Sequence, residues 1–183
     1  MKQSASHLEI ILAGSGGQGL ILSAMLLAEA AILERKNVVQ TQSYGIASRG
    51  GLSLAEVIID EAEIIFQQVR KPDCVLALTE EAARKYESWA AKGVPIFYDS
   101  TLADARTGPN FHGHAFTRMA SDLGNAGSVN ILALGTVAAH TGAVKRASLE
   151  QLIRKRFNGA AAELNLKVLA AGCDLDQPQR VLA

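Results

Sequence analysis

The feature that most constrains this sequence is a run of glycines between a short apolar stretch and a longer apolar pattern. Residues 8–13 (LEIILA) predict a buried strand, and the chain then reads GSGGQG from Gly14 to Gly19. Residues 20–35 are rich in alanine, leucine, isoleucine and glutamate, which predicts a helix. A second short strand is expected at 38–41, so the segment resembles the beginning of a βαβ unit.

The rest of the chain continues to alternate between strand and helix patterns. Strands are expected at 52–59, 74–79 and 95–98, and the first of them can pair antiparallel after the preceding loop. Helices are expected from Thr79 onward and at 130–140, 149–157 and 160–171, and a short helical turn is expected at 119–123. Gly172 is expected to end the last helix, and residues 104–114 are expected to form a loop. The pattern predicts a Rossmann-like α/β fold with a mostly parallel sheet flanked by helices. We expect a single domain over 1–183, with its core at about 8–172 and a polar tail at 173–183.

Composition narrows the class of protein. The 183 residues are 49% hydrophobic and carry a net charge of zero, which favours one well-packed domain and argues against a nucleic-acid-binding protein. Cys74 and Cys173 are far apart and form no CxxC pair, so the chain lacks the usual ligands of an iron–sulfur cluster or structural zinc. No apolar run reaches the about 18 residues of a membrane span. We therefore expect a cytoplasmic location and no membrane contact.

The glycine turn allows several interpretations. Gly14, Gly16 and Gly19 match G-x-G-x-x-G between a strand and a helix, where the helix N-terminus favours a phosphate. An NAD site also needs an acid at the end of the second strand, but residues 39–42 read VQTQ. A Walker A site fails because no Gly-Lys-Ser/Thr follows. Another phosphate ligand, or a tight turn that only packs the helix on the strand, remains open.

A second glycine-rich segment, 42–51 (QSYGIASRGG), is expected to be a loop near the same edge of the sheet. Its glycines permit close backbone approach, and Arg49 can pair with a phosphate or remain a solvated surface side chain. Tyr44 can stack on an adenine or a partner, or anchor its own loop. Asn130 begins a helix pattern, where either capping or ligand contact fits.

The segments GSGGQG, QSYGIASRGG and VNILALG together resemble the gamma subunit of the 2-oxoacid:ferredoxin oxidoreductases. This group includes enzymes for pyruvate, 2-oxoglutarate, 2-oxoisovalerate and indolepyruvate. The resemblance extends from about Ile10 to Gly172 and includes ELNLKVLAAG near the end. It implies a complex that oxidatively decarboxylates a 2-oxoacid, with thiamine diphosphate forming the covalent adduct, iron–sulfur clusters taking the electrons, coenzyme A accepting the acyl group, and ferredoxin leaving reduced.

The resemblance also implies a division of labour between subunits. Thiamine diphosphate and the clusters belong to the alpha, beta and ferredoxin-like delta subunits, whereas this chain supports assembly and forms part of the coenzyme A site. Alone, it is expected to be inactive and to form a homodimer or expose an apolar patch. The implied cofactor-binding residues are Gly14, Ser15, Gly16, Gly17, Gln18, Gly19, Tyr44, Arg49, Gly50, Gly51 and Asn130, with no catalytic residue and no metal ligand. The alternative is a freestanding Rossmann-type nucleotide-binding protein or reductase.

Overall fold

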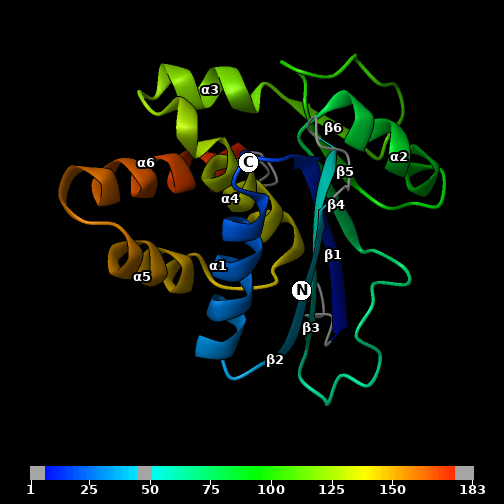
Figure 1. Cartoon of the computed structure of the whole chain (residues 1–183), viewed down its shortest axis with the longest axis horizontal. Coiled ribbons are helices and arrows are strands. Elements are labelled where there is room, and N and C mark those ends of the chain that lie inside the picture. The colour runs from blue at the N-terminus through cyan, green and yellow to red at the C-terminus, as the bar shows by residue number, and fades with distance from the viewer. Residues whose placement is uncertain (1–6, 45–50, 176–183) are drawn as a thin grey trace, which may run out of the picture.

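A six-stranded sheet forms the middle layer of the molecule and has helices on both faces (Figure 1). The computed structural model describes residues 7–44 and 51–175. The strands are β1 (His7–Ser15), β2 (Asn37–Tyr44), β3 (Leu52–Asp60), β4 (Cys74–Ala77), β5 (Ile96–Asp99) and β6 (Phe111–His114). The helices are α1 (Leu20–Leu33), α2 (Glu80–Ala90), α3 (Phe116–Asp122), α4 (Val129–Thr141), α5 (Arg146–Arg156) and α6 (Gly159–Leu175), with a short 3-10 turn at Ala126–Ser128.

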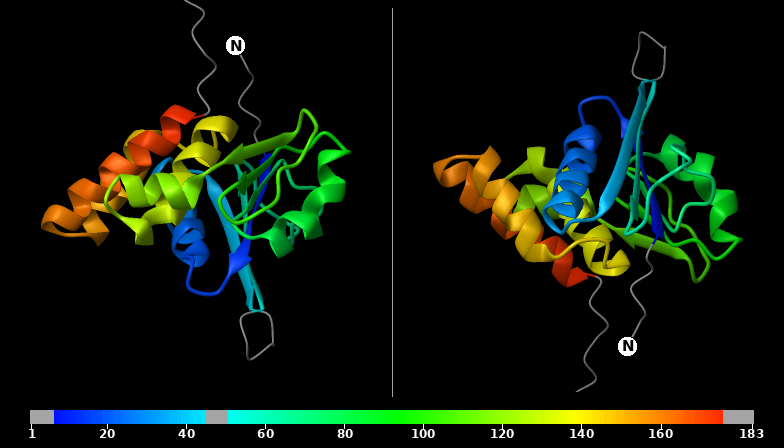
Figure 2. Two further views of the ribbon diagram at one scale, coloured as in Figure 1. Left: turned by 90° about the horizontal axis from the view of Figure 1, so that it is seen from above. Right: turned by 90° about the horizontal axis from the view of Figure 1, so that it is seen from below.

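The strands lie in the order β2-β3-β1-β4-β5-β6. β1, β4, β5 and β6 are successive parallel neighbours, whereas β3 is antiparallel to both β1 and β2. The predicted βαβ unit is therefore present with β3 inserted between its two strands. The expected α/β class with a mostly parallel sheet is confirmed, and so is the antiparallel option for β3. β2 and β3 reach beyond the helices at the end where residues 44 and 51 lie (Figure 2).

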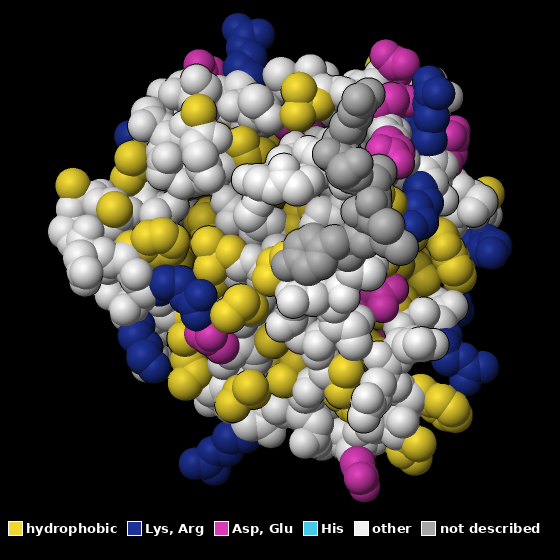
Figure 3. All heavy atoms as spheres, in the orientation of Figure 1, with side chains coloured by type: hydrophobic (Ala, Val, Ile, Leu, Met, Phe, Trp, Pro, Cys, Tyr) yellow, Lys and Arg dark blue, Asp and Glu magenta, His cyan; other side chains and the backbone are white. Residues whose placement is uncertain are grey.

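The surface mixes the two signs of charge. In the view of Figure 3, cationic and anionic side chains alternate with hydrophobic and uncharged ones, and no single-sign patch covers that face. Among the described residues, no helix is long and apolar enough to cross a membrane.

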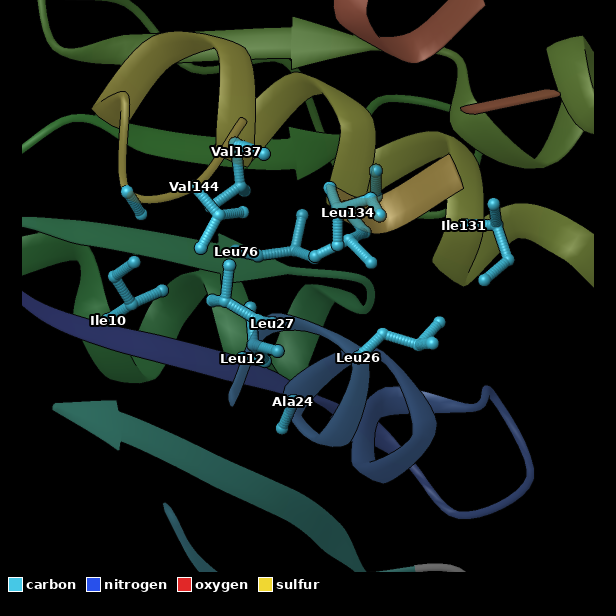
Figure 4. Packing of buried hydrophobic residues seen from close by; sticks show 14 of the residues in the cluster. Ile10, Leu12, Ala24, Leu26, Leu27, Leu76, Ile131, Leu134, Val137 and Val144 are labelled. Atoms are coloured by element: carbon cyan, nitrogen blue, oxygen red, sulfur yellow. The ribbon is translucent and has the colours of Figure 1, made fainter. Parts of the chain in front are cut away.

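The buried strands supply two hydrophobic cores, one on each face of the sheet. Along β1, Ile10 and Leu12 point toward α1 and α4, whereas Ile11 and Ala13 point toward α2, because successive side chains of a strand alternate. On the larger side, the side chains of β1, β4, α1 and α4 interdigitate, as Figure 4 shows for Leu12, Leu76, Leu27 and Leu134. α1 and α4 are thereby fixed against this face of the sheet.

Gly172 lies inside α6, which continues to Leu175, so the prediction that this glycine stops the helix is wrong. A Cβ at Gly172 would overlap the carbonyl oxygen of Leu132 on α4, and one at Gly135 would lie 2.5 Å from the carbonyl oxygen of Leu169 on α6. The two glycines thus allow the backbones of α4 and α6 to pack in direct contact.

Three other predicted boundaries are corrected. The last four residues of the expected loop at 104–114 form β6, because parallel pairing with β5 overrides a local pattern that contains glycine. Residues 42–44 belong to β2 rather than to the glycine loop, since they pair with β3. α5 begins at Arg146, three residues before the predicted start at 149.

Candidate functional site: the glycine turn at the sheet edge

The glycine turn connects the carboxyl end of β1 to the N-terminus of α1 (Figure 1). Gly17 and Gly19 have φ angles of 86° and 74°, in the left-handed region that only glycine enters at little cost. Gly19 is the residue that precedes the first turn of α1. These two conformations reverse the chain within a few residues and direct the helix back along the sheet.

Gln18 braces the turn from inside. Its Oε1 accepts a hydrogen bond from the backbone N–H of Ser15 at 2.8 Å, and its Nε2 donates to the carbonyl oxygen of Leu78 at 3.1 Å. Leu78 directly follows β4, so Gln18 joins the turn to the neighbouring parallel strand. A Cβ at Gly14 would overlap Oε1 of Gln18, which explains the glycine there. Gln18 and Gly14 therefore serve the fold of the turn.

Asn130 braces the turn from α4. Its Nδ2 donates to the carbonyl oxygen of Gly19 at 3.1 Å, and its own carbonyl oxygen accepts from the Ser23 hydroxyl at 3.1 Å. The Asn130 side chain is almost completely buried, and a Cβ at Gly19 would lie 2.7 Å from its Cγ. Asn130 thus fastens the N-terminus of α1 to α4 through its side-chain amide group.

Gly16 and Gly17 differ from the other glycines of the turn. Both are exposed, and among the described residues a Cβ placed on either of them would meet no other atom within 4 Å. α1 has no acidic residue in its first turn and no side-chain cap. The turn therefore presents open backbone beside an uncapped helix N-terminus, whose N–H groups and partial positive charge favour an anion.

The second glycine-rich segment begins and ends at the same edge of the sheet. Ser15 is paired with Leu52, and Tyr44 with Ser53, so β1, β2 and β3 place these ends side by side. Gly51 is half-buried immediately before β3. Arg49 and Gly50 lie outside the described residues.

A cluster of charges that the sequence did not reveal lies near the carboxyl ends of β4 and β5. Glu80, at the start of α2, accepts hydrogen bonds from Arg106 Nη2 at 3.0 Å, from the Asp104 N–H at 3.0 Å and from Arg84 Nε at 2.6 Å. The hydrogen bond from Arg106 is the main reason why the pKa of Glu80 falls to about 2. These contacts fasten the loop after β5 to α2, and a separation of 26 residues hid the pair from sequence patterns.

Two other polar side chains on β5 and β6 stabilise the fold. Asp99 is buried and accepts from the N–H groups of Thr101 and Thr117, so it joins the turn after β5 to the start of α3. His112 stacks on Phe97, with their ring centroids 4.8 Å apart. Within the described part of the chain, no group of three or more His, Cys, Asp or Glu side chains is arranged to hold a metal ion.

Comparison with known proteins assigns the family. Residues 9–175 match the family model described as pyruvate ferredoxin/flavodoxin oxidoreductase. The chain belongs to this family. It is 39% identical over 170 residues to the 2-oxoglutarate synthase subunit KorC of Archaeoglobus fulgidus, covering 92% of this chain and 88% of that subunit. This similarity confirms the resemblance to gamma subunits and favours it over a freestanding reductase.

Solved structures agree with this assignment. The gamma subunit of a keto/oxoacid ferredoxin oxidoreductase from Geobacter sulfurreducens is 37% identical, with a TM-score of 0.78 over 92% of this chain and 97% of that one. A 2-oxoglutarate:ferredoxin oxidoreductase from Magnetococcus marinus, solved with 2-oxoglutarate, coenzyme A and succinyl-CoA, has the same fold in part of a longer chain. That similarity has a TM-score of 0.83 at 20% identity and covers 93% of this chain and 31% of that one.

Proposed function

We propose that this chain is the subunit of a 2-oxoacid:ferredoxin oxidoreductase that packs onto the thiamine-binding subunits and contributes part of the coenzyme A site. The observation that carries the proposal is the open backbone at Gly16 and Gly17 beside the uncapped N-terminus of α1. A pyrophosphate or the 3′-phosphate of coenzyme A is an anion of the kind that such a turn favours.

The residues of the turn divide into two roles under this proposal. Ser15, Gln18, Gly19 and Asn130 hold the turn in shape through the contacts described above. Gly16 and Gly17 approach the phosphate, and Arg49 with Gly50 and Gly51 approach it from the second segment. Bound coenzyme A supplies the thiol that accepts the acyl group. The chain's own contribution is to bind and orient the phosphate end of that molecule.

Thiamine diphosphate and the iron–sulfur clusters belong to alpha, beta and ferredoxin-like delta subunits in this proposal, with ferredoxin as the electron acceptor of the complex. Cys74 and Cys173 are both buried, which fits a chain whose cysteines pack in the core. We further propose a cytoplasmic location and 2-oxoglutarate as the oxidised acid, because the Archaeoglobus relative is a 2-oxoglutarate synthase subunit.

The coenzyme A role is tested by reconstituting the complex with substituted subunits. Gly16→Val closes the open backbone, and Arg49→Ala removes a charge-assisted contact of about 1.5–3 kcal/mol, which corresponds to a roughly 10- to 150-fold weaker apparent affinity for coenzyme A. Arg118→Ala is the matched control, because Arg118 is an exposed arginine on α3. If complexes with Gly16→Val and Arg49→Ala assemble and keep the wild-type affinity, the turn serves packing alone.

The isolated chain provides the complementary measurement. It should contain no iron and no thiamine, and it should not oxidise 2-oxoglutarate or pyruvate until the other subunits are added. Turnover that stays with the purified chain through successive chromatographic steps would refute the assignment of the chemistry to the partners.

A further inference from the structure

The outer edge of β2 is a row of backbone hydrogen-bonding groups at one end of the sheet. β2 is the first strand in the order, and within the described ranges it pairs only with β3. The pairing runs without a break from Asn37 opposite Asp60 to Tyr44 opposite Ser53, so no bulge bends the strand.

The residues that face outward follow from hydrogen bonds deeper in the sheet. The carbonyl oxygens of Glu9 and Ala13 accept hydrogen bonds from backbone N–H groups directly before and after β4. The backbone N–H and C=O groups of the odd-numbered residues of β1 therefore point toward β4, and those of the even-numbered residues point toward β3. The same alternation holds in the antiparallel pairs β1–β3 and β3–β2. In the observed registers, the backbone N–H and C=O groups of the odd-numbered residues of β2 therefore point toward β3. The outward N–H and C=O groups are those of Val38, Gln40, Gln42 and Tyr44.

This edge lacks the features that usually prevent strands from pairing. Natural edge strands are short, bulged, or interrupted by proline or charged residues. β2 has eight residues, NVVQTQSY, with no charge, no proline and no glycine. At the opposite edge, β6 has only four residues and includes Gly113. The two edges of one sheet thus differ, and only β2 has the length and composition of a strand that pairs.

The helix beside this edge is also incompletely covered. α1 packs on β2 and β3, and Glu29 is its single charged residue in LILSAMLLAEAAIL. Ile32 and Leu33 are 59% and 47% exposed near its C-terminal end, and Figure 3 shows hydrophobic side chains at the surface over α1. A helix that is apolar on nearly all sides is typical of one covered by protein all round.

We propose that a second copy of this chain pairs with β2, antiparallel and about a two-fold axis perpendicular to the sheet. The axis passes between the two copies of Thr41, so Gln40 of one copy lies opposite Gln42 of the other, and Val38 lies opposite Tyr44. This register gives every outward residue of β2 a partner and places no charged residue opposite another. The net charge of zero adds no overall repulsion between copies.

The first test removes the outward N–H groups of the full-length isolated chain. Gln40→Pro and Gln42→Pro leave the β2–β3 ladder intact, whereas Gln40→Ala and Gln42→Ala are matched controls that keep the N–H groups. By light scattering after size exclusion, wild type and the alanine variants should be dimers. Each proline should weaken dimerisation roughly thirtyfold, because two-fold symmetry removes two hydrogen bonds at once. A monomeric wild type, or folded proline variants that stay as dimeric as wild type, overturns the proposal.

The second test requires no proline and reports the register directly. The two Thr41 residues form a non-hydrogen-bonded antiparallel pair with Cα atoms about 4.5 Å apart, a distance at which a disulfide can form. Thr41→Cys should therefore form a cross-linked dimer under mild oxidation, against a low background because both native cysteines are buried. Leu102→Cys, at an exposed position after β5, is the control. Equal cross-linking through the two positions overturns the proposal. Both measurements use the chain without coenzyme A, so they fail or succeed independently of the proposed function.

Discussion

Gly19→Ala should destabilise the chain strongly, and the structure gives the size of the effect. An alanine at the φ of 74° costs about 1–2 kcal/mol as a left-handed residue. Its Cβ would also lie 2.7 Å from the buried amide of Asn130 and displace the hydrogen bond to the carbonyl oxygen of Gly19. Leaving that amide unsatisfied costs about 1–3 kcal/mol more. We expect a total loss of about 2–5 kcal/mol in the free energy of unfolding.

Calorimetry of the isolated chain can measure this loss. For a domain of this size, each 1 kcal/mol lowers Tm by roughly 2–4 °C, so Gly19→Ala should lower Tm by roughly 4–20 °C. Gly16→Ala is the matched control, because the same substitution there meets open space without a positive φ. We expect the control to change stability by no more than about 1 kcal/mol. An equal, small effect of both substitutions would refute the packing argument.

A double-mutant cycle separates strain from steric overlap. In an Asn130→Ala background the amide is gone, so Gly19→Ala should cost only the about 1–2 kcal/mol of backbone strain. The difference between the two backgrounds measures the contact between Gly19 and Asn130. A cost that is identical in both backgrounds would contradict the idea that this glycine makes room for Asn130.

Three further predictions concern the scaffold around the turn. Gly172→Ala should lower the free energy of unfolding by about 1–3 kcal/mol in denaturant titrations, because the added methyl overlaps a backbone carbonyl of α4; unchanged stability would contradict direct backbone contact. Glu80→Gln should be less stable than wild type at neutral pH, and the gap should close as the pH falls from about 4.5 to about 2, since Arg106 lowers the pKa of Glu80; a gap that persists at low pH would argue against the pairing. Hydrogen bonding to Asp60 raises the pKa of His7 above 6.5, so its stabilisation is complete below pH 6.5 and is lost as the pH rises through the raised pKa. His7→Gln should flatten that part of the stability profile, and an unaltered profile would exclude His7 as its source.

The parts of the fold that depend on local patterns were predictable from the sequence. β1, the turn and α1 follow from a short apolar run, a glycine cluster and an apolar helix pattern that are adjacent in the chain. The insertion of β3 between β1 and β2 was not predictable to the same degree, because it depends on pairing between distant residues. β6 was missed for a related reason: FHGH has no clear alternation of apolar and polar residues, and the strand is defined by its neighbour β5.

The roles of individual glycines in the turn depend on neighbours that the motif does not contain. Gln18 bonds to Leu78, 60 residues away, and Asn130 bonds to Gly19 across 111 residues. Those contacts explain why Gly14 and Gly19 have no side chain, whereas nothing in the part of the chain that the structure describes fills the space beside Gly16 and Gly17. A glycine that the fold requires reveals little about a ligand, and a glycine beside open space requires another explanation. The case for a phosphate therefore rests on Gly16 and Gly17, since the other two glycines would be needed even in an empty turn.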